Sequence, residues 1–135
     1  MPRHARTRRA SAAQGRSYLG KAEEFLAAAQ ESLDNGRTVA ATSLAVHAGI
    51  NAADAITSAR MGQRAAGPGH DEAFVLLEQA GPEGKSAATH LRRLLPLKSR
   101  AEYDPDDVPR STATKAVSWA EKVVTTAQRV IDALR

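Results

Sequence analysis

The chain has 135 residues, a length typical of one domain with a modest core, and only 4% of them are aromatic. The absence of cysteine excludes a disulfide scaffold, a thiolate zinc site and a cysteine nucleophile. The net charge of +4 is unevenly placed: residues 1–16 hold five arginines and no acid, so the rest of the chain sums to −1.

The basic segment 1–16 is predicted to be a disordered arm, and residues 17–135 the folded domain. Such an arm could contact nucleic acid through its charge, although the aromatic residues typical of a single-strand-binding surface are missing from it. The sequence shows no signal peptide and no membrane span. We therefore expect a cytoplasmic protein without membrane contact.

Two long helices are predicted next. The first runs from about residue 13 to residue 33, because apolar residues recur on one helical face, and Asn35-Gly36 ends it. The second runs from residue 38 to about residue 60 and is apolar on most sides. This pattern is typical of the central helix of a bundle.

The remaining segments also predict helices. Residues 62–69 are predicted to form a loop, followed by a short helix that Asp71 could cap, and residues 81–84 to break the chain. A fourth helix meets Pro96 and restarts through Tyr103, and the last helix begins near Ser111. No strand signal competes. The short connections favour an all-α, up-and-down antiparallel bundle of four main helices plus a short helix.

Three polar residues interrupt the apolar second helix. His47, Asn51 and Asp54 are spaced by four and three, so they point within roughly 60° of one another and form a polar stripe. An unpaired buried polar group costs about 1–3 kcal/mol, so these side chains need partners. Arg100 and Tyr103, three apart on a later helical segment, are the expected partners.

These residues allow a functional and a structural interpretation. A neutral histidine beside a carboxylate is a proton acceptor near neutral pH, but the stripe could also be a buried network that fixes helix register. Arg100 could hold a phosphate, with Lys98 adding charge, or form a structural pair with Asp54 or Glu102. Tyr103 could act as an acid or lie at the edge of the core.

Three segments together resemble the HEPN superfamily. They are Ala45-Val-His-Ala-Gly-Ile-Asn-Ala-Ala-Asp54, Gly69-His-Asp-Glu-Ala73 and Lys98-Ser-Arg-Ala-Glu-Tyr-Asp104, and the resemblance spans residues 17 to 134. It implies a bacterial α-helical bundle that is commonly dimeric. Many members are RNase toxins or their inactive relatives, and many are encoded beside a small nucleotidyltransferase antitoxin.

The toxins of this family carry an arginine followed, after four to six intervening residues, by a histidine. After Arg100 these positions hold a proline and two aspartates (105–107), and neither Arg92 nor Arg93 has a histidine at that spacing. On this basis we expect the usual RNase dyad to be absent.

The sequence therefore favours a HEPN-like module that binds a nucleotide, RNA or a partner protein, as a component of a toxin–antitoxin type of system. Its expected site is a cleft in which arginine and lysine hold phosphate and the stripe orients a base or sugar, formed by His47, Asn51, Asp54, Lys98, Arg100 and Tyr103. The alternatives are a ribonuclease toxin using His47 and Arg100, and a structural bundle without a ligand. The expected partners are a second copy of the chain and a nucleotidyltransferase-type antitoxin. We expect no metal and no cofactor.

Overall fold

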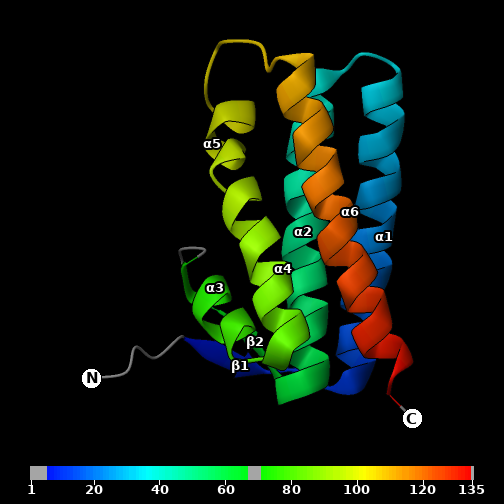
Figure 1. Ribbon diagram of the computed structural model, residues 1–135, viewed down its shortest axis with the longest axis vertical. Helices are drawn as coiled ribbons and strands as arrows, with labels where there is room; N and C mark the ends of the chain where they lie inside the picture. The colour runs from blue at the N-terminus through cyan, green and yellow to red at the C-terminus, as the bar shows by residue number, and fades with distance from the viewer. Residues whose placement is uncertain (1–5, 67–70, 135) are drawn as a thin grey trace.

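The structure is a computed structural model that describes residues 6–66 and 71–134. Its elements in chain order are β1 (Thr7–Arg9), α1 (Ala12–Asp34), α2 (Thr38–Met61), β2 (Gln63–Ala65), α3 (Asp71–Glu78), α4 (Gly81–Leu94), α5 (Leu97–Glu102) and α6 (Arg110–Asp132). The long helices α1, α2 and α6 lie side by side, and α4 packs alongside α2 and α6 (Figure 1). The predicted all-α bundle is confirmed.

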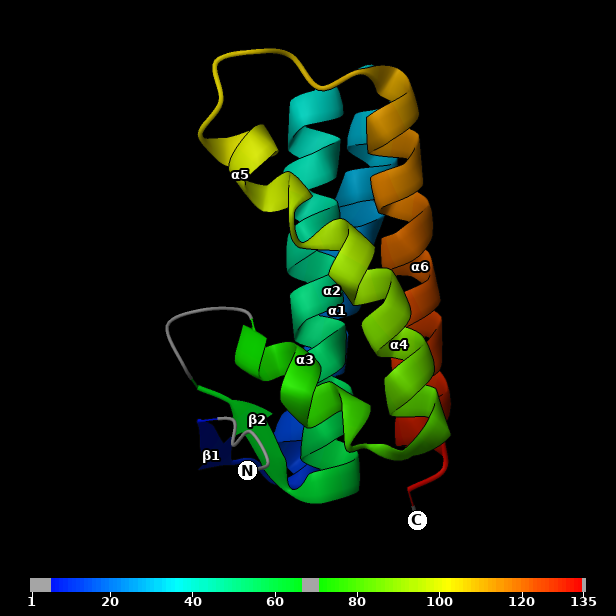
Figure 2. The ribbon, with the colours of Figure 1, turned by 60° about the vertical axis from the view of Figure 1, so that its left-hand side comes forward.

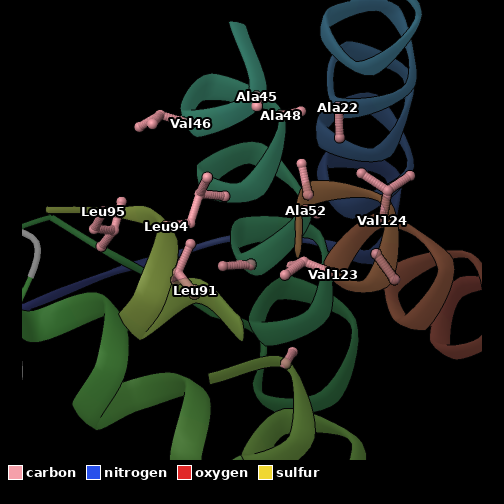
Figure 3. Packing of buried hydrophobic residues seen from close by; sticks show 14 of the residues in the cluster. Ala22, Ala45, Val46, Ala48, Ala52, Leu91, Leu94, Leu95, Val123 and Val124 are labelled. Carbon is pink, nitrogen blue, oxygen red and sulfur yellow. The ribbon is translucent and has the colours of Figure 1, made fainter. Parts of the chain in front are cut away.

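The core is built around α2, which packs against α1, α4 and α6. Small residues such as Ala45, Ala48 and Ala52 are fully buried there, while leucines of α4 and valines of α6 fill the space beside them (Figure 3). A Cβ added at Gly49 would lie 2.6 Å from Leu94 Cδ2. The small side chains of α2 therefore allow its neighbours to approach closely, as the sequence indicated.

By its length and its apolar composition, α2 could cross a membrane. However, 56% of its most apolar 18-residue stretch is buried inside the bundle. Core helices of globular domains pass the same test. The hydropathy of α2 is explained by its central position.

A small antiparallel sheet differs from the sequence prediction. Thr7, Arg8 and Arg9 pair with Ala65, Arg64 and Gln63, in that order. Backbone hydrogen bonds of 2.9 Å extend the pairing at both ends, from Ala10 N to Gly62 O and from Ala66 N to the carbonyl of residue 6. The predicted disordered arm therefore contains a strand, and the predicted loop 62–69 contains its partner. Residues 1–5 and 67–70 of these predictions lie outside the described residues.

The first helix also begins inside the predicted arm. The Ser11 hydroxyl accepts a hydrogen bond from Gln14 N at 3.1 Å, and Ser11 N donates to Gln14 Oε1 at 2.8 Å. This capping box satisfies two backbone donors that a helix start leaves unpaired. It fixes the start of α1 at Ala12, separated from the end of β1 by two residues, so regular structure is present before residue 17.

A second correction concerns residues 81–84, which the sequence predicted to break the chain. They form the first turn of α4. Pro82 is suited to this place because the first backbone N–H groups of a helix have no intrahelical acceptor. Glu83 in the same turn accepts a hydrogen bond of 3.0 Å from Arg60 Nη2, which joins the start of α4 to the end of α2.

Candidate functional site

The polar stripe of α2 runs between two groups of shorter elements. Figures 1 and 2 show α5 near one end of α2, and α3 with the β1–β2 ribbon near the other, on the same side of the bundle. His47 and Asp54 are seven residues apart, so they are separated by roughly 10 Å along the helix axis. The stripe therefore extends along α2 from the region near α5 toward the region near the ribbon.

His47 lies at the α5 end. Its Nε2 atom is 3.9 Å from Glu102 Oε1, and its side chain is 38% exposed. The imidazole also packs on the ring of Phe25 from α1, with 5.5 Å between the ring centroids and 32° between the planes. The histidine is thus held between an aromatic ring and a carboxylate, with part of its surface open to solvent.

Asn51 is occupied locally. Its Nδ2 atom donates a hydrogen bond of 2.8 Å to the backbone carbonyl of His47, one helical turn earlier. Side-chain bonds of this kind satisfy a polar group within its own helix. Asn51 therefore does not need the partner on another helix that the sequence argument required.

Asp54 is the most perturbed group of the stripe. It lies beside Ala65 of β2 and Ala73 and Leu76 of α3, with no room for a water molecule between them. Burial disfavours the charged form and raises the pKa of this carboxyl from 3.8 to about 6, although the positive charge of Arg64 acts in the opposite direction. Asp54 therefore titrates close to neutral pH.

Lys98 and Arg100 of α5, and Tyr103 directly after it, make no hydrogen bond or ion pair with the stripe in the described part of the chain. Ala101 is buried, Lys98 is half-buried and Arg100 is exposed, while Tyr103 is 73% exposed. The α5 side chain that approaches His47 is Glu102, and the cation whose charge acts on Asp54 is Arg64. The structure thus gives the stripe other partners than Arg100 and Tyr103.

Arg64 is the site residue that sequence reasoning missed. It lies in a short strand with no apolar alternation, within a segment predicted to be a loop. Only the pairing of β1 with β2 reveals its surroundings, because that register sets Arg8 of the arm directly opposite it. The ribbon therefore places Arg64 where its charge acts on Asp54, and pairs it with the exposed Arg8 of the arm.

Comparison with known proteins supports the resemblance described above. A protein-family model described as HEPN domain matches residues 16–130, which extends from the first turns of α1 almost to the end of α6. No curated protein matches the chain in sequence.

The expectation that the family's RNase spacing is absent needs a correction. The expectation rested on the residues that follow Arg92, Arg93 and Arg100. Arg64, however, is followed by His70 after five intervening residues, and this spacing fits the pattern. Arg64 is also the arginine whose charge acts on Asp54. His70 lies outside the described residues, so this correction rests on the sequence alone.

Proposed function

Because this chain belongs to the HEPN family and its basic arm pairs beside the polar stripe, we propose that it is an RNA-binding HEPN module. The proposed binding surface consists of the β1–β2 ribbon and the α2 stripe, with Lys98 and Arg100 at the far end. The observation that carries the proposal is the position of Arg8 opposite Arg64.

The ribbon has an electrostatic reason to bind a polyanion. Like charges directly opposite each other in an antiparallel pair are destabilising, and an isolated two-stranded ribbon is only marginally stable in water. Phosphate groups placed against Arg8 and Arg64 would remove this repulsion. Arg6 and Arg9 are also exposed and add to the positive charge of the same strand segment.

The stripe supplies hydrogen-bonding groups beside this charge. His47 is partly exposed at one end of the stripe, and Asp54 at the other end has a pKa of about 6. Lys98 and Arg100 follow on α5, so cations flank the stripe at both ends. In this arrangement the arginines and lysine contact phosphate, and the stripe contacts a base or sugar.

The proposal is tested by measuring the affinity for a fluorescently labelled single-stranded RNA as a function of salt. The double variant Arg8→Ala/Arg64→Ala is expected to bind at least roughly tenfold more weakly, because a hydrogen bond to a charged group is worth one to two orders of magnitude in affinity. Two lost phosphate contacts would lower the slope of log K against log salt by about 1.4.

Lys115→Ala is the matched control, because Lys115 is an exposed cation on α6. It is expected to retain the wild-type affinity and slope. Equal losses in the control and the double variant would show that only bulk charge matters. A loss on Arg100→Ala with none on the double variant would place binding at α5 and reject the ribbon.

A ribonuclease is the second candidate, and two observations favour it. Asp54 has a pKa near 6, where a carboxyl can exchange protons at neutral pH, and the Arg64–His70 spacing fits the RNase motif of the family. The test is cleavage of RNA by the purified chain, with Arg64→Ala and His70→Ala set against His47→Ala and Arg100→Ala. If cleavage is lost only in Arg64→Ala and His70→Ala, the activity is assigned to the motif. If it is lost only in the other two variants, it is assigned to His47 and Arg100. If the wild-type chain binds RNA without cleaving it, the ribonuclease hypothesis is rejected.

We further propose that the chain acts as a homodimer and pairs with a nucleotidyltransferase-type antitoxin in the cytoplasm, as the family resemblance implies. In the described part of the chain, the large apolar side chains that remain exposed are Val39 and Tyr103, at 38% and 73%. Light scattering on the purified chain is expected to give twice the monomer mass, and Val39→Asp/Tyr103→Asp to reduce it. A wild-type monomer at high concentration contradicts the homodimer.

A further inference from the structure

A second polar region lies between α4 and α6, apart from the stripe and the ribbon. It is a groove of about 330 Å³, lined among others by Ser86, His90, Glu121, Lys122, Thr125 and Arg129. Figure 2 shows α4 and α6 side by side, away from the ribbon. Grooves between the helices of bundles are common places for small ligands, and this volume lies at the lower end of their range.

Helical spacing brings the groups of this groove together. On α6, Lys122, Thr125 and Arg129 are separated by three and four residues, so they share one face. On α4, Ser86 and His90 are one turn apart and face the same groove. The groove therefore presents two cationic side chains and three hydroxyl groups within a small volume, although the hydroxyl of Thr126 donates to the backbone carbonyl of Lys122.

The acid of the groove has a partner on another helix. Glu121 Oε1 accepts a hydrogen bond of 3.0 Å from Gln30 Nε2 of α1. This bond ties the carboxylate to the α1 side of α6. The other polar lining residues are donors or can donate, which suits an anion with several oxygen atoms.

The imidazole ring of His90 has one buried nitrogen atom. Its Nδ1 atom is buried and has no hydrogen-bond partner in the described part of the chain. Burial, reinforced by the positive charges of Lys122 and Arg93, lowers the pKa of His90, so the ring is neutral at neutral pH. With no acceptor at Nδ1, the neutral ring keeps its proton on Nε2, which then donates. A neutral histidine donor beside cations is suited to an anionic ligand.

We propose that the α4–α6 groove binds a phosphate group, held by Lys122 and Arg129 with hydrogen bonds from His90 Nε2 and the hydroxyls of Ser86 and Thr125. A guanidinium matches two phosphate oxygens, whereas an ammonium acts as a point charge. The phosphate is either inorganic or part of a small phosphate ester. This site is independent of the RNA surface proposed above.

The test is a titration of the ¹⁵N-labelled full chain with inorganic phosphate at constant ionic strength. The imidazole nitrogens of His90 and the amides of Thr125 and Arg129 are followed by NMR. Saturable shifts confined to the groove are expected. Arg129→Met and Lys122→Met are each expected to weaken binding roughly tenfold. Both residues are exposed, so the variants should keep the fold, which their spectra verify.

Lys115→Met is the matched control, since it removes one exposed cation from the same helix outside the groove. It should bind phosphate like the wild type. Shifts that do not saturate, that chloride reproduces, or that Lys115→Met weakens equally would overturn the proposal. A parallel titration with ribose 5-phosphate distinguishes the two possible ligands. Binding tighter than that of inorganic phosphate supports a phosphate-ester site, and binding of equal strength supports a site for inorganic phosphate.

Discussion

The replacement Asp54→Asn should make the protein more stable at neutral pH, and the gain should depend on pH in a defined direction. The carboxyl has a pKa of about 6 in the folded protein against an ordinary value of 3.8, because burial disfavours its charged form. The folded state therefore holds the proton more tightly than the unfolded state. The contribution of Asp54 to the free energy of unfolding is fully present below about pH 4 and is lost as the pH rises through about 6.

The magnitude follows from the size of the shift. A difference of about two pKa units corresponds to about 3 kcal/mol of unfolding free energy at pH 7.5 relative to pH 4. Asparagine has nearly the same shape and no charge, so the variant lacks this loss. For a domain of this size the difference is on the order of 10 °C in melting temperature.

The assay is urea unfolding of wild type and Asp54→Asn at several values between pH 4 and pH 8. The stability of the variant minus that of the wild type should rise as pH increases from about 4 to about 6, and should level off at higher pH. Asp104→Asn, which removes a carboxylate from an exposed loop, should give a difference that does not change with pH. A flat difference for Asp54→Asn would refute the claim that burial perturbs this carboxyl.

Three further predictions follow from particular contacts. Arg64→Ala should raise the pKa of Asp54 further, because the guanidinium charge lowers it; an NMR titration of the Asp54 carboxyl measures this, and an unchanged pKa would remove Arg64 from the site. Gly84→Ala should destabilise the protein by roughly 3 kcal/mol in urea unfolding, since the new Cβ would lie 2.2 Å from the backbone oxygen of residue 77. Gly20→Ala, where nothing lies within 4 Å, should instead stabilise by roughly 0.5–1 kcal/mol, and similar effects at both glycines would contradict the packing. Ser11→Ala should cost about 1 kcal/mol by removing the capping box and should increase hydrogen exchange at the start of α1; unchanged exchange would show that the cap does not hold this end.

The candidate site could be predicted from the sequence only where one helix contains it. His47, Asn51 and Asp54 share a face of α2 because their spacing alone decides this. Their partners could not be predicted in the same way. Glu102 and Arg64 reach the stripe through the orientation of α5 and the pairing of β2, and Asn51 bonds within its own helix.

The sequence by itself determined the helical class, the long helices and the central place of α2, because apolar periodicity and small side chains act locally along the chain. Only the tertiary structure decided that the arginine-rich start of the chain forms a strand against residues 63–65. That pairing depends on where the ends of α1 and α2 meet in space, which no local pattern of a three-residue strand encodes. The charge of the arm was visible in the sequence, and its pairing with the strand that carries Arg64 was set by the fold.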